Sequence, residues 1–498
     1  MIAVIQLDAV SGPLLEGLLA AGKLETLAAL RSRGRWLALE TPATHFPAGS
    51  YASLYSGLPI SEHGMYYAFQ WAPEQQRVRW RGTFPQPMMV WERLARAGKR
   101  ALVVDPYECE RPAVADGVIL AGWQLENVMS LPKWSHPKSA TAELARVLGA
   151  PDAINEVFGP PNVRTLVELR RRLLAAADRS AEAAVHLLRR ERFDLVWIDL
   201  LSGHLGGHMF WDLSQIDARA LDKATRTTLE RALEDLYVQM DRSLGRIVAE
   251  LPEADLMLTT PMSMGVNMSR VDFLPGMLEA VLGNRRAETR AERFLWRLRG
   301  AVPTEARAKV ANVLHGPLTR ELTMRLSSIG VDWSKTPVFM LPSDHFGQLR
   351  LNVRGRERDG IVEPRDVDAL VAELREGLLS FRDPDGEPAV VAVDRTTDLF
   401  AGGAFLELLP DLIVRWSERP VGGVDTVSSP RFGEVRRPGS GSGRSGAHRP
   451  DSWALLVPSN TSFVENGAPQ VLDVVPTICA ALGVGSADLP GSPLLAPA

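Results

Sequence analysis

The sequence predicts an α/β protein with a mainly parallel central sheet and helices on both faces. Short apolar runs alternate with segments of helical apolar spacing along the chain, a pattern typical of a parallel sheet covered by helices. The N-terminal run Ile2–Leu7 is apolar throughout and ends at Asp8, as expected of a strand buried on both faces. Hydrophobic residues make up 45% of the chain and charged residues 23%, the balance of a globular protein.

Each predicted element follows from its local pattern. The predicted strands of the sheet are Ile2–Leu7, Trp36–Leu39, Ala101–Val104, Gly117–Leu120, Leu195–Leu200 and Leu256–Leu258. The predicted helices are Leu14–Arg31, Val90–Ala97, Val163–Ala176, Ala181–Arg190, Leu221–Leu251, Val367–Leu379 and Val471–Leu482, with another beginning near Ser50. Later apolar runs at 337–351, 389–393 and 412–414 predict further strands.

We expect three parts along the chain. Residues 1–283 form the first part of the core, and 284–334 form an Arg-rich helical insertion. Residues 335–498 complete the core and add a small α/β subdomain with a late histidine loop. That loop is Gly/Ser-rich from Gly439 to Gly446 and is followed by His448, so it predicts a site loop.

Charge and cysteine content exclude several classes of function. The net charge of −4 provides no basic field for nucleic acid or an anionic membrane, but it leaves room for local basic patches around a small anionic substrate. Two cysteines, Cys109 and Cys479, cannot build a disulfide framework. The N-terminus has no signal-peptide pattern and no apolar run could span a membrane, so we expect a cytoplasmic protein. The oligomeric state stays open.

The strongest local signal is the pair His204 and His208 within Ser202-Gly-His-Leu-Gly-Gly-His-Met-Phe-Trp-Asp212. If this stretch is helical, residues four apart project from one face and can share one ion. In parallel sheets ligands bind beyond the carboxyl ends of the strands. Polar side chains that follow predicted strands or the Gly/Ser loop are therefore further candidates: Asp8, Thr44, Ser50 and His448. His63 and His345 are weaker candidates, for which a structural role is favoured.

Several segments, in a shared order, resemble the alkaline-phosphatase superfamily, on its type I phosphodiesterase/nucleotide pyrophosphatase side. Short motifs spread over nearly the whole chain carry the resemblance: Val4-Ile-Gln-Leu-Asp8, Glu40 to Gly57 with Glu62-His-Gly-Met65, His204–His208, Leu349 to Glu357, Pro410-Asp-Leu-Ile-Val414, Ser445-Gly-Ala-His448 and Asp473-Val-Val-Pro-Thr477. The family uses two adjacent metal ions, usually zinc, and a Thr or Ser nucleophile that attacks phosphorus in line.

The sequence departs from the family pattern at three places. His204 replaces the Asp of Asp-x-x-x-His, and Pro261 and Met262 replace the Asp and His of Ser-Asp-His-Gly. Counting back from Gly57 puts the nucleophile at Pro47, and a small insertion would restore either Thr44 or Ser50.

The resemblance and these departures together imply an altered metal centre. Its candidate ligands are Asp8, His204, His208 and His448, of which the three imidazoles suit zinc and would also accept iron or manganese. Thr44 or Ser50 is the candidate nucleophile. Candidates for gripping an anionic substrate are Arg354, Arg356 and Arg444.

Three functions remain open at this point. The first is a metal-dependent hydrolase or transferase acting on a phosphoryl or related ester at a single His-rich site. The second is a non-hydrolytic metalloenzyme on the same fold, with lyase, isomerase or oxygen chemistry. The third is a catalytically inactive relative that acts as a binding protein, because fold alone does not fix function.

Overall fold

A computed structural model describes residues 1–124, 133–150, 161–216, 221–283, 320–321, 324, 331–343, 345–438, 441–465 and 467–497. Its centre is an eight-stranded sheet with strand order β2-β18-β9-β1-β8-β5-β6-β7. The strands are β1 (Ile2–Leu7), β2 (Arg35–Leu39), β5 (Ala101–Val104), β6 (Gly117–Ala121), β7 (Trp134–His136), β8 (Leu195–Leu200), β9 (Asp255–Thr260) and β18 (Ser452–Val457).

The middle of this sheet is parallel. Strand β1 lies between β8 and β9 with Ile5 opposite both Ile198 and Leu258, and β5 and β6 extend the parallel array. Strand β18 runs antiparallel to β9 and β2, and β7 runs antiparallel to β6. The predicted mainly parallel sheet is therefore confirmed. The parallel pairing also places the carboxyl ends of β1, β8 and β9 side by side.

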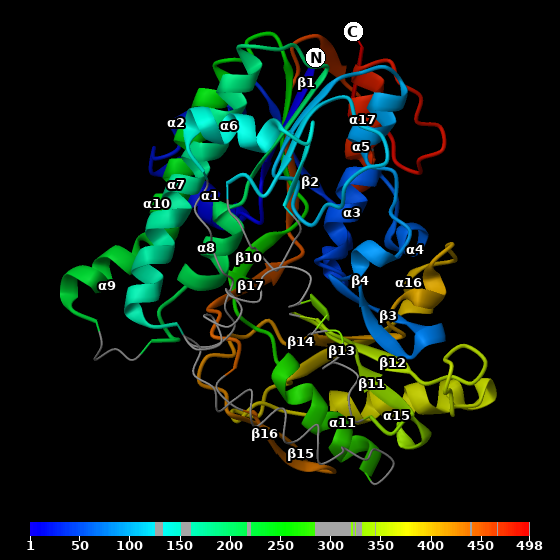
Figure 1. The fold of residues 1–498 in the computed structure, drawn as a ribbon. Helices are drawn as coiled ribbons and strands as arrows, with labels where there is room; N and C mark the ends of the chain where they lie inside the picture. Colours follow the sequence, from blue (N-terminus) through cyan, green and yellow to red (C-terminus); the bar gives the residue numbers. More distant parts are fainter. Residues whose placement is uncertain are drawn as a thin grey trace.

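Helices cover both faces of the sheet (Figure 1). One side carries α1 (Gly12–Ala20), α2 (Glu25–Arg31), α6 (Ala140–Leu148), α7 (Val163–Leu188) and α10 (Ala232–Val248), which continues from the short α9 (Lys223–Glu230). The other side carries α3 (Gly49–Ser56), α5 (Val90–Arg96) and α17 (Val474–Ala481), with α4 (Ile60–His63) nearby. The strands between these layers are almost fully buried and form the main hydrophobic core.

Four predicted helices have different boundaries in the structure. The predicted helix Leu14–Arg31 is two helices, because Gly22 adopts a φ of +67° that turns the chain between them. The predicted helix at 221–251 is also divided, into α9 and α10. Conversely, the two helices predicted over 163–190 are the single helix α7, whose buried small residues, such as Ala177 and Ala181, continue through the expected gap.

A smaller antiparallel sheet forms a second layer beyond the first. Its strand order is β11-β12-β14-β13, with β11 (Val338–Met340), β12 (Gly347–Leu351), β13 (Val390–Arg395) and β14 (Leu412–Trp416). Helices α11 (Leu274–Leu282) and α15 (Val367–Leu379) share a separate hydrophobic core with it. The predicted insertion at 284–334 lies mostly outside the described residues.

The remaining strands are short two-stranded pairs. They are β3 (Phe69–Ala72) with β4 (Arg77–Trp80), β10 (Ser263–Val266) with β17 (Gly446–Arg449), β15 (Thr426–Ser429) with β16 (Gly433–Arg436), and β19 (Thr461–Phe463) with β20 (Leu495–Pro497).

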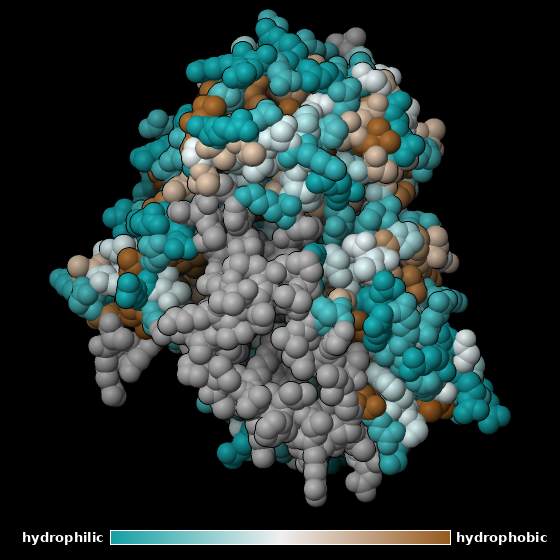
Figure 2. Space-filling view, in the orientation of Figure 1, coloured by the Kyte–Doolittle hydropathy of each residue, from teal (hydrophilic) through white to brown (hydrophobic). Residues whose placement is uncertain are grey.

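The surface is that of a polar protein. On the face shown in Figure 2, apolar residues form small separate groups among hydrophilic ones. Within the described ranges, none of the helices is both long enough and apolar enough to cross a membrane.

Candidate metal centre

The stretch after β8 folds as helix α8 (Ser202–Phe210). His204 and His208 therefore lie one turn apart and project from one face of this helix. Asp8 lies at the end of the neighbouring strand β1, and its backbone N–H donates to the carbonyl of Leu200 at 3.2 Å. The start of α8 is thereby fixed at the carboxyl edge of the sheet, next to Asp8.

The third histidine reaches this place from far along the chain. His448 lies on β17, which pairs with β10 just beyond the end of β9. Strand β17 touches α8 closely because residue 446 is glycine: a Cβ there would lie 2.0 Å from the Gly207 carbonyl oxygen. Ser445 strengthens the contact, since its N–H donates to the His208 carbonyl at 2.8 Å.

Three imidazoles converge as a result. One nitrogen of each of His204, His208 and His448 lies within 4.8 Å of the others. The ring centroid of His448 is 4.9 Å from the centroids of both His204 and His208. All three are nearly buried, with exposed fractions of 3%, 3% and 6%. The structure thus brings together the three predicted histidines.

Hydrogen bonds on the outer side of two rings set their tautomers. His204 Nδ1 lies 2.7 Å from Asp8 Oδ2, and His208 Nδ1 lies 3.2 Å from the Gly446 carbonyl oxygen. Both partners are acceptors, so each Nδ1 donates a proton outward and each Nε2 is directed into the cluster. The two Nε2 atoms face each other at 3.2 Å.

This donor set fits a metal ion. Two nitrogens bound to one tetrahedral zinc at about 2.0–2.1 Å lie roughly 3.3 Å apart, close to the Nε2 separation seen here. His448 Nδ1 is buried and has no hydrogen-bond partner in the described part of the chain. The buried unpaired nitrogen of His448 is unfavourable alone, and a cation shared with the two Nε2 atoms would satisfy it.

Burial favours the neutral form of two of the three imidazoles. It lowers the pKa of His208 well below the usual value, and the charges of Arg444, His448 and His204 lower it further. The pKa of His448 is lowered in the same way, first by burial and then by His204, His345 and Arg444. Neutral imidazole is the form that binds a metal, so these shifts favour coordination.

Asp8 lies behind His204 rather than within the three-histidine cluster. Its carboxylate accepts hydrogen bonds from Gln6 Nε2 at 3.2 Å and from the Tyr51 hydroxyl at 2.9 Å, besides the His204 contact. Burial and the nearby Asp8 raise the pKa of Tyr51 well above 10, so its hydroxyl keeps its proton. The geometry gives Asp8 the role of orienting a ligand, as carboxylates behind metal-bound histidines commonly do.

The two candidate nucleophiles have different surroundings. Thr44 ends the short 3₁₀ helix η1 (Pro42–Thr44), which packs against β17, and its partly exposed hydroxyl donates to the Thr41 carbonyl at 3.3 Å. Ser50 lies in the first turn of α3, is fully buried, and donates to the Phe46 carbonyl at 3.2 Å. Thr44 is therefore more accessible to solvent than Ser50.

Two of the three predicted arginines are engaged elsewhere. Arg356 forms a bidentate pair with Asp411 at 2.6 and 2.7 Å in the small-sheet region. Arg354 is 62% exposed and pairs with Glu363. Arg444 is different, because its charge acts on both His208 and His448. Only Arg444 is placed beside the histidines.

The positions of the replaced family ligands are apolar. Met262 is fully buried in the main core, and its carbonyl accepts from the Thr260 hydroxyl at 2.5 Å. Within the described residues the metal-binding group contains no carboxylate.

Sequence reasoning missed two neighbours of the cluster. Tyr51 bridges Asp8 and His204, its hydroxyl lying 3.1 Å from His204 Nδ1, yet a tyrosine in an apolar helix carries no signal of such a role. Met264 lies directly opposite His448 in the β10–β17 pair, a register that the sequence pattern does not reveal.

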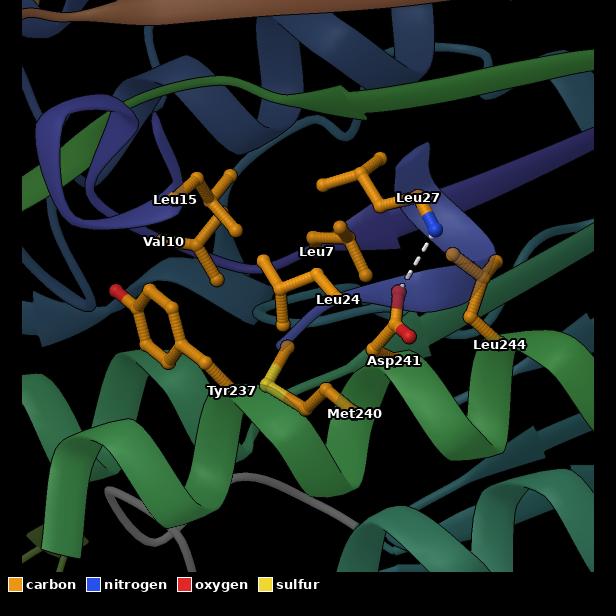
Figure 3. Close-up of a pocket in the computed structure, with 9 residues that line it drawn as sticks. All are labelled: Leu7, Val10, Leu15, Leu24, Leu27, Tyr237, Met240, Asp241 and Leu244. Atoms are coloured by element: carbon orange, nitrogen blue, oxygen red, sulfur yellow. Dashed lines mark hydrogen bonds between the residues drawn. The ribbon is translucent and has the colours of Figure 1, made fainter. Parts of the chain in front are cut away.

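An apolar pocket also occurs on the α10 side of the sheet (Figure 3). Its two polar groups are already engaged: the Asp241 carboxylate accepts from the N–H groups of Thr26 and Leu27, and the Tyr237 hydroxyl accepts from the Ser11 N–H. It therefore offers no donors for a metal or a phosphate. The pocket is lined by Leu7, Val10, Leu15, Leu24, Leu27, Tyr237, Met240, Asp241 and Leu244.

The fold and the polar cluster define an α/β protein with a site beyond the carboxyl ends of parallel strands. Residues 2–419 match the model of the type I phosphodiesterase / nucleotide pyrophosphatase family. The chain therefore belongs to this family, which lies in the alkaline-phosphatase superfamily. No curated protein matches the sequence.

Solved structures are similar to this chain at low sequence identity. Phosphonoacetate hydrolase from Sinorhizobium meliloti 1021, in complex with phosphonoacetate, is similar with a TM-score of 0.50 and 14% identity over 97% of this chain and 95% of that chain. Human ectonucleotide pyrophosphatase / phosphodiesterase 5 is similar with a TM-score of 0.46 and 10% identity, over 99% and 97% of the two chains.

Proposed function

We propose that the protein is a metal-dependent hydrolase or transferase that acts on a phosphoryl or related ester. A single divalent ion, zinc in the first instance, would be held by His204, His208 and His448. The observation that carries the proposal is the convergence of these three imidazoles on one point at the sheet edge. Membership of the phosphodiesterase family supports the substrate class.

Several side chains around the histidines would each have a separate role in the reaction. When bound, the ion would act as a Lewis acid on the ester. Asp8 and Tyr51 hold the His204 ring in the orientation that points Nε2 inward. The Arg444 charge beside His208 and His448 would attract an anionic substrate. Thr44 is the favoured nucleophile, because Ser50 is fully buried and hydrogen-bonded within its helix.

Metal content and turnover together test the proposal. We expect one zinc per purified chain and hydrolysis of bis(4-nitrophenyl) phosphate. His204→Ala and His208→Ala should lose the metal and at least about a hundredfold in kcat/KM, since a Lewis-acid metal supplies several kcal/mol. His186→Ala is a matched control, because this histidine lies on α7 outside the cluster. Wild-type turnover that persists unchanged in the two cluster variants would refute the proposal.

The burial of the centre motivates one alternative. With exposed fractions of only 3–6%, the imidazoles leave little open surface for an ester, and the described residues contain no carboxylate-rich second site. A binding protein without catalysis would account for both features. Stoichiometric metal without turnover on phosphodiesters or phosphonates would favour that alternative.

A further inference from the structure

One sulfur-containing side chain lies beside the three histidines. Met264 on β10 is paired directly with His448 on β17 in an antiparallel register. Directly opposed residues in such a pair project to the same face of the strands, with Cβ atoms about 4.5–5.5 Å apart. The Met264 and His448 side chains therefore leave their strands on the same side.

That side is turned toward α8. The His448 ring reaches the rings of His204 and His208 there. A Cβ added to Gly207 would lie 2.7 Å from Met264 Cγ and 3.7 Å from Met264 Cε. The Met264 side chain, which carries its sulfur between these two carbons, therefore packs against the helix residue that precedes His208. Glycine at 207 leaves the space that this side chain fills.

We infer that Cu(I) binds at this centre, with the Met264 thioether as an additional soft ligand, and so competes with Zn²⁺ for it. The inference rests on the three-histidine centre of the proposed function. Thioether sulfur and imidazole together form a soft donor set that selects Cu(I), whereas a hard divalent ion gains little from a thioether.

Charge and burial point in the same direction. The described metal-binding group consists of imidazoles and contains no carboxylate, and Met264, only 1% exposed, is uncharged. The positive charge of Arg444 also acts on His208 and His448. The cost of burying an ion and its repulsion from a nearby cation both rise with ionic charge, so a monovalent ion is penalised less here than a divalent one. Cu(I) is also the weaker Lewis acid, so its binding would inhibit hydrolysis.

The test measures metal binding to the full-length protein rather than activity. Under anaerobic, thiol-free conditions, Cu(I) buffered with bicinchoninate is titrated into the zinc-loaded protein, and both metals are counted. We expect one Cu(I) to displace one Zn²⁺, with a sulfur neighbour in the copper X-ray absorption spectrum. Met264→Leu should weaken Cu(I) binding by about tenfold or more, which is the loss of affinity usual when a residue around a metal site is mutated. The same variant should still bind Zn²⁺. Met277→Leu, in the second core, should change neither.

The outcomes separate this inference from the proposed function. Stoichiometric Zn²⁺ that Cu(I) cannot displace, or Cu(I) bound without a sulfur neighbour, would overturn the inference and leave the hydrolase proposal standing. Equal Cu(I) affinity in Met264→Leu and the wild type would do the same. Failure of the wild type to bind either metal would overturn both. If Met264→Leu does not fold, the displacement of Zn²⁺ by Cu(I) in the wild type and its copper X-ray absorption spectrum still test the inference.

Discussion

The carboxyl edge of the large sheet and the small antiparallel sheet use charged and titratable side chains in opposite ways. At the large-sheet edge, the nitrogens of three buried histidines face one another, and one of them, His448 Nδ1, has no hydrogen-bond partner in the described chain. In the small-sheet region, the Glu357 carboxylate accepts from Arg350 Nε at 2.8 Å, Arg356 Nε at 3.0 Å and Trp71 Nε1 at 2.6 Å. One region directs imidazole nitrogens at one another, and the other pairs a buried carboxylate with arginines of its own chain.

This difference shows why residue type alone does not identify a site. An arginine that already has carboxylate partners stabilises the fold, and recruiting it for a substrate would leave a buried carboxylate unpaired. A buried imidazole with no internal partner is costly to the fold, so its presence points to a ligand. The predictions below test this contrast.

The largest expected effect concerns His63, a buried histidine whose two nitrogens are both satisfied. Its Nδ1 accepts from the Met65 N–H at 2.9 Å, and its Nε2 contacts the Ser53 hydroxyl at 2.9 Å. Burial, with a smaller contribution from the Arg81 charge, lowers the pKa of His63 from 6.5 to about 3. The unfolded chain therefore binds a proton below pH 6.5 that the folded chain takes up only near pH 3. Stability should fall by up to about 5 kcal/mol as the pH falls through this window.

Denaturant unfolding of wild type and His63→Gln between pH 7 and pH 3.5 checks the effect. The wild type should lose stability more steeply below pH 6.5 than the variant. Burial raises the pKa of Asp105 to about 6, and this group acts with the opposite sign, but it is present in both proteins and cancels in the difference. Parallel profiles for the two proteins would contradict the prediction.

Glu357→Gln should have the next largest effect on the free energy of unfolding. The substitution leaves the fully buried Arg350 guanidinium with Asp411 at 4.0 Å as its remaining carboxylate neighbour. Breaking one side of a buried ion pair costs about 3–5 kcal/mol, so the free energy of unfolding should fall by that amount. Metal content should stay unchanged, because the small-sheet network contributes no ligand. Glu434→Gln is the matched control, since Glu434 belongs to an exposed pair with Arg436.

The contrast also explains what the sequence could predict. The parallel sheet follows from apolar runs such as Ile2–Leu7, and the His204–His208 geometry follows from the helical period; both depend on local pattern. The position of His448 depends on the pairing of β17 with β10, which is distant in the sequence. His448 could be predicted as a site residue because its motif follows the others in the order typical of a known family. The pairing of Arg356 with Asp411 could not be predicted from the local sequence pattern, because the two residues are 55 positions apart. The loop conformation that separates Thr44 from Ser50 likewise depends on tertiary packing.

Asp8→Asn should lower zinc affinity by about 10- to 100-fold without removing the site. The amide is a weaker acceptor than the carboxylate, so it holds the His204 Nδ1–H less firmly and makes the ring a poorer ligand. Tyr51→Phe removes only the phenol donor to Asp8 and should cause a smaller loss. Competition with a chromophoric chelator measures both affinities. Complete loss of zinc in Asp8→Asn, with the fold intact, would instead indicate that Asp8 is a ligand.

The smallest expected effect distinguishes Arg354 from Arg444. Arg354 is 62% exposed and its pair with Glu363 is a surface ion pair, so Arg354→Ala should change the free energy of unfolding by less than about 0.5 kcal/mol and leave KM for an anionic ester unchanged. Arg444→Ala, in contrast, should raise that KM by roughly tenfold or more, the value of a charge-assisted hydrogen bond to the substrate. Steady-state kinetics at fixed ionic strength measure both variants. A KM that rises for Arg354→Ala and not for Arg444→Ala would place the substrate over the small sheet, away from the histidines.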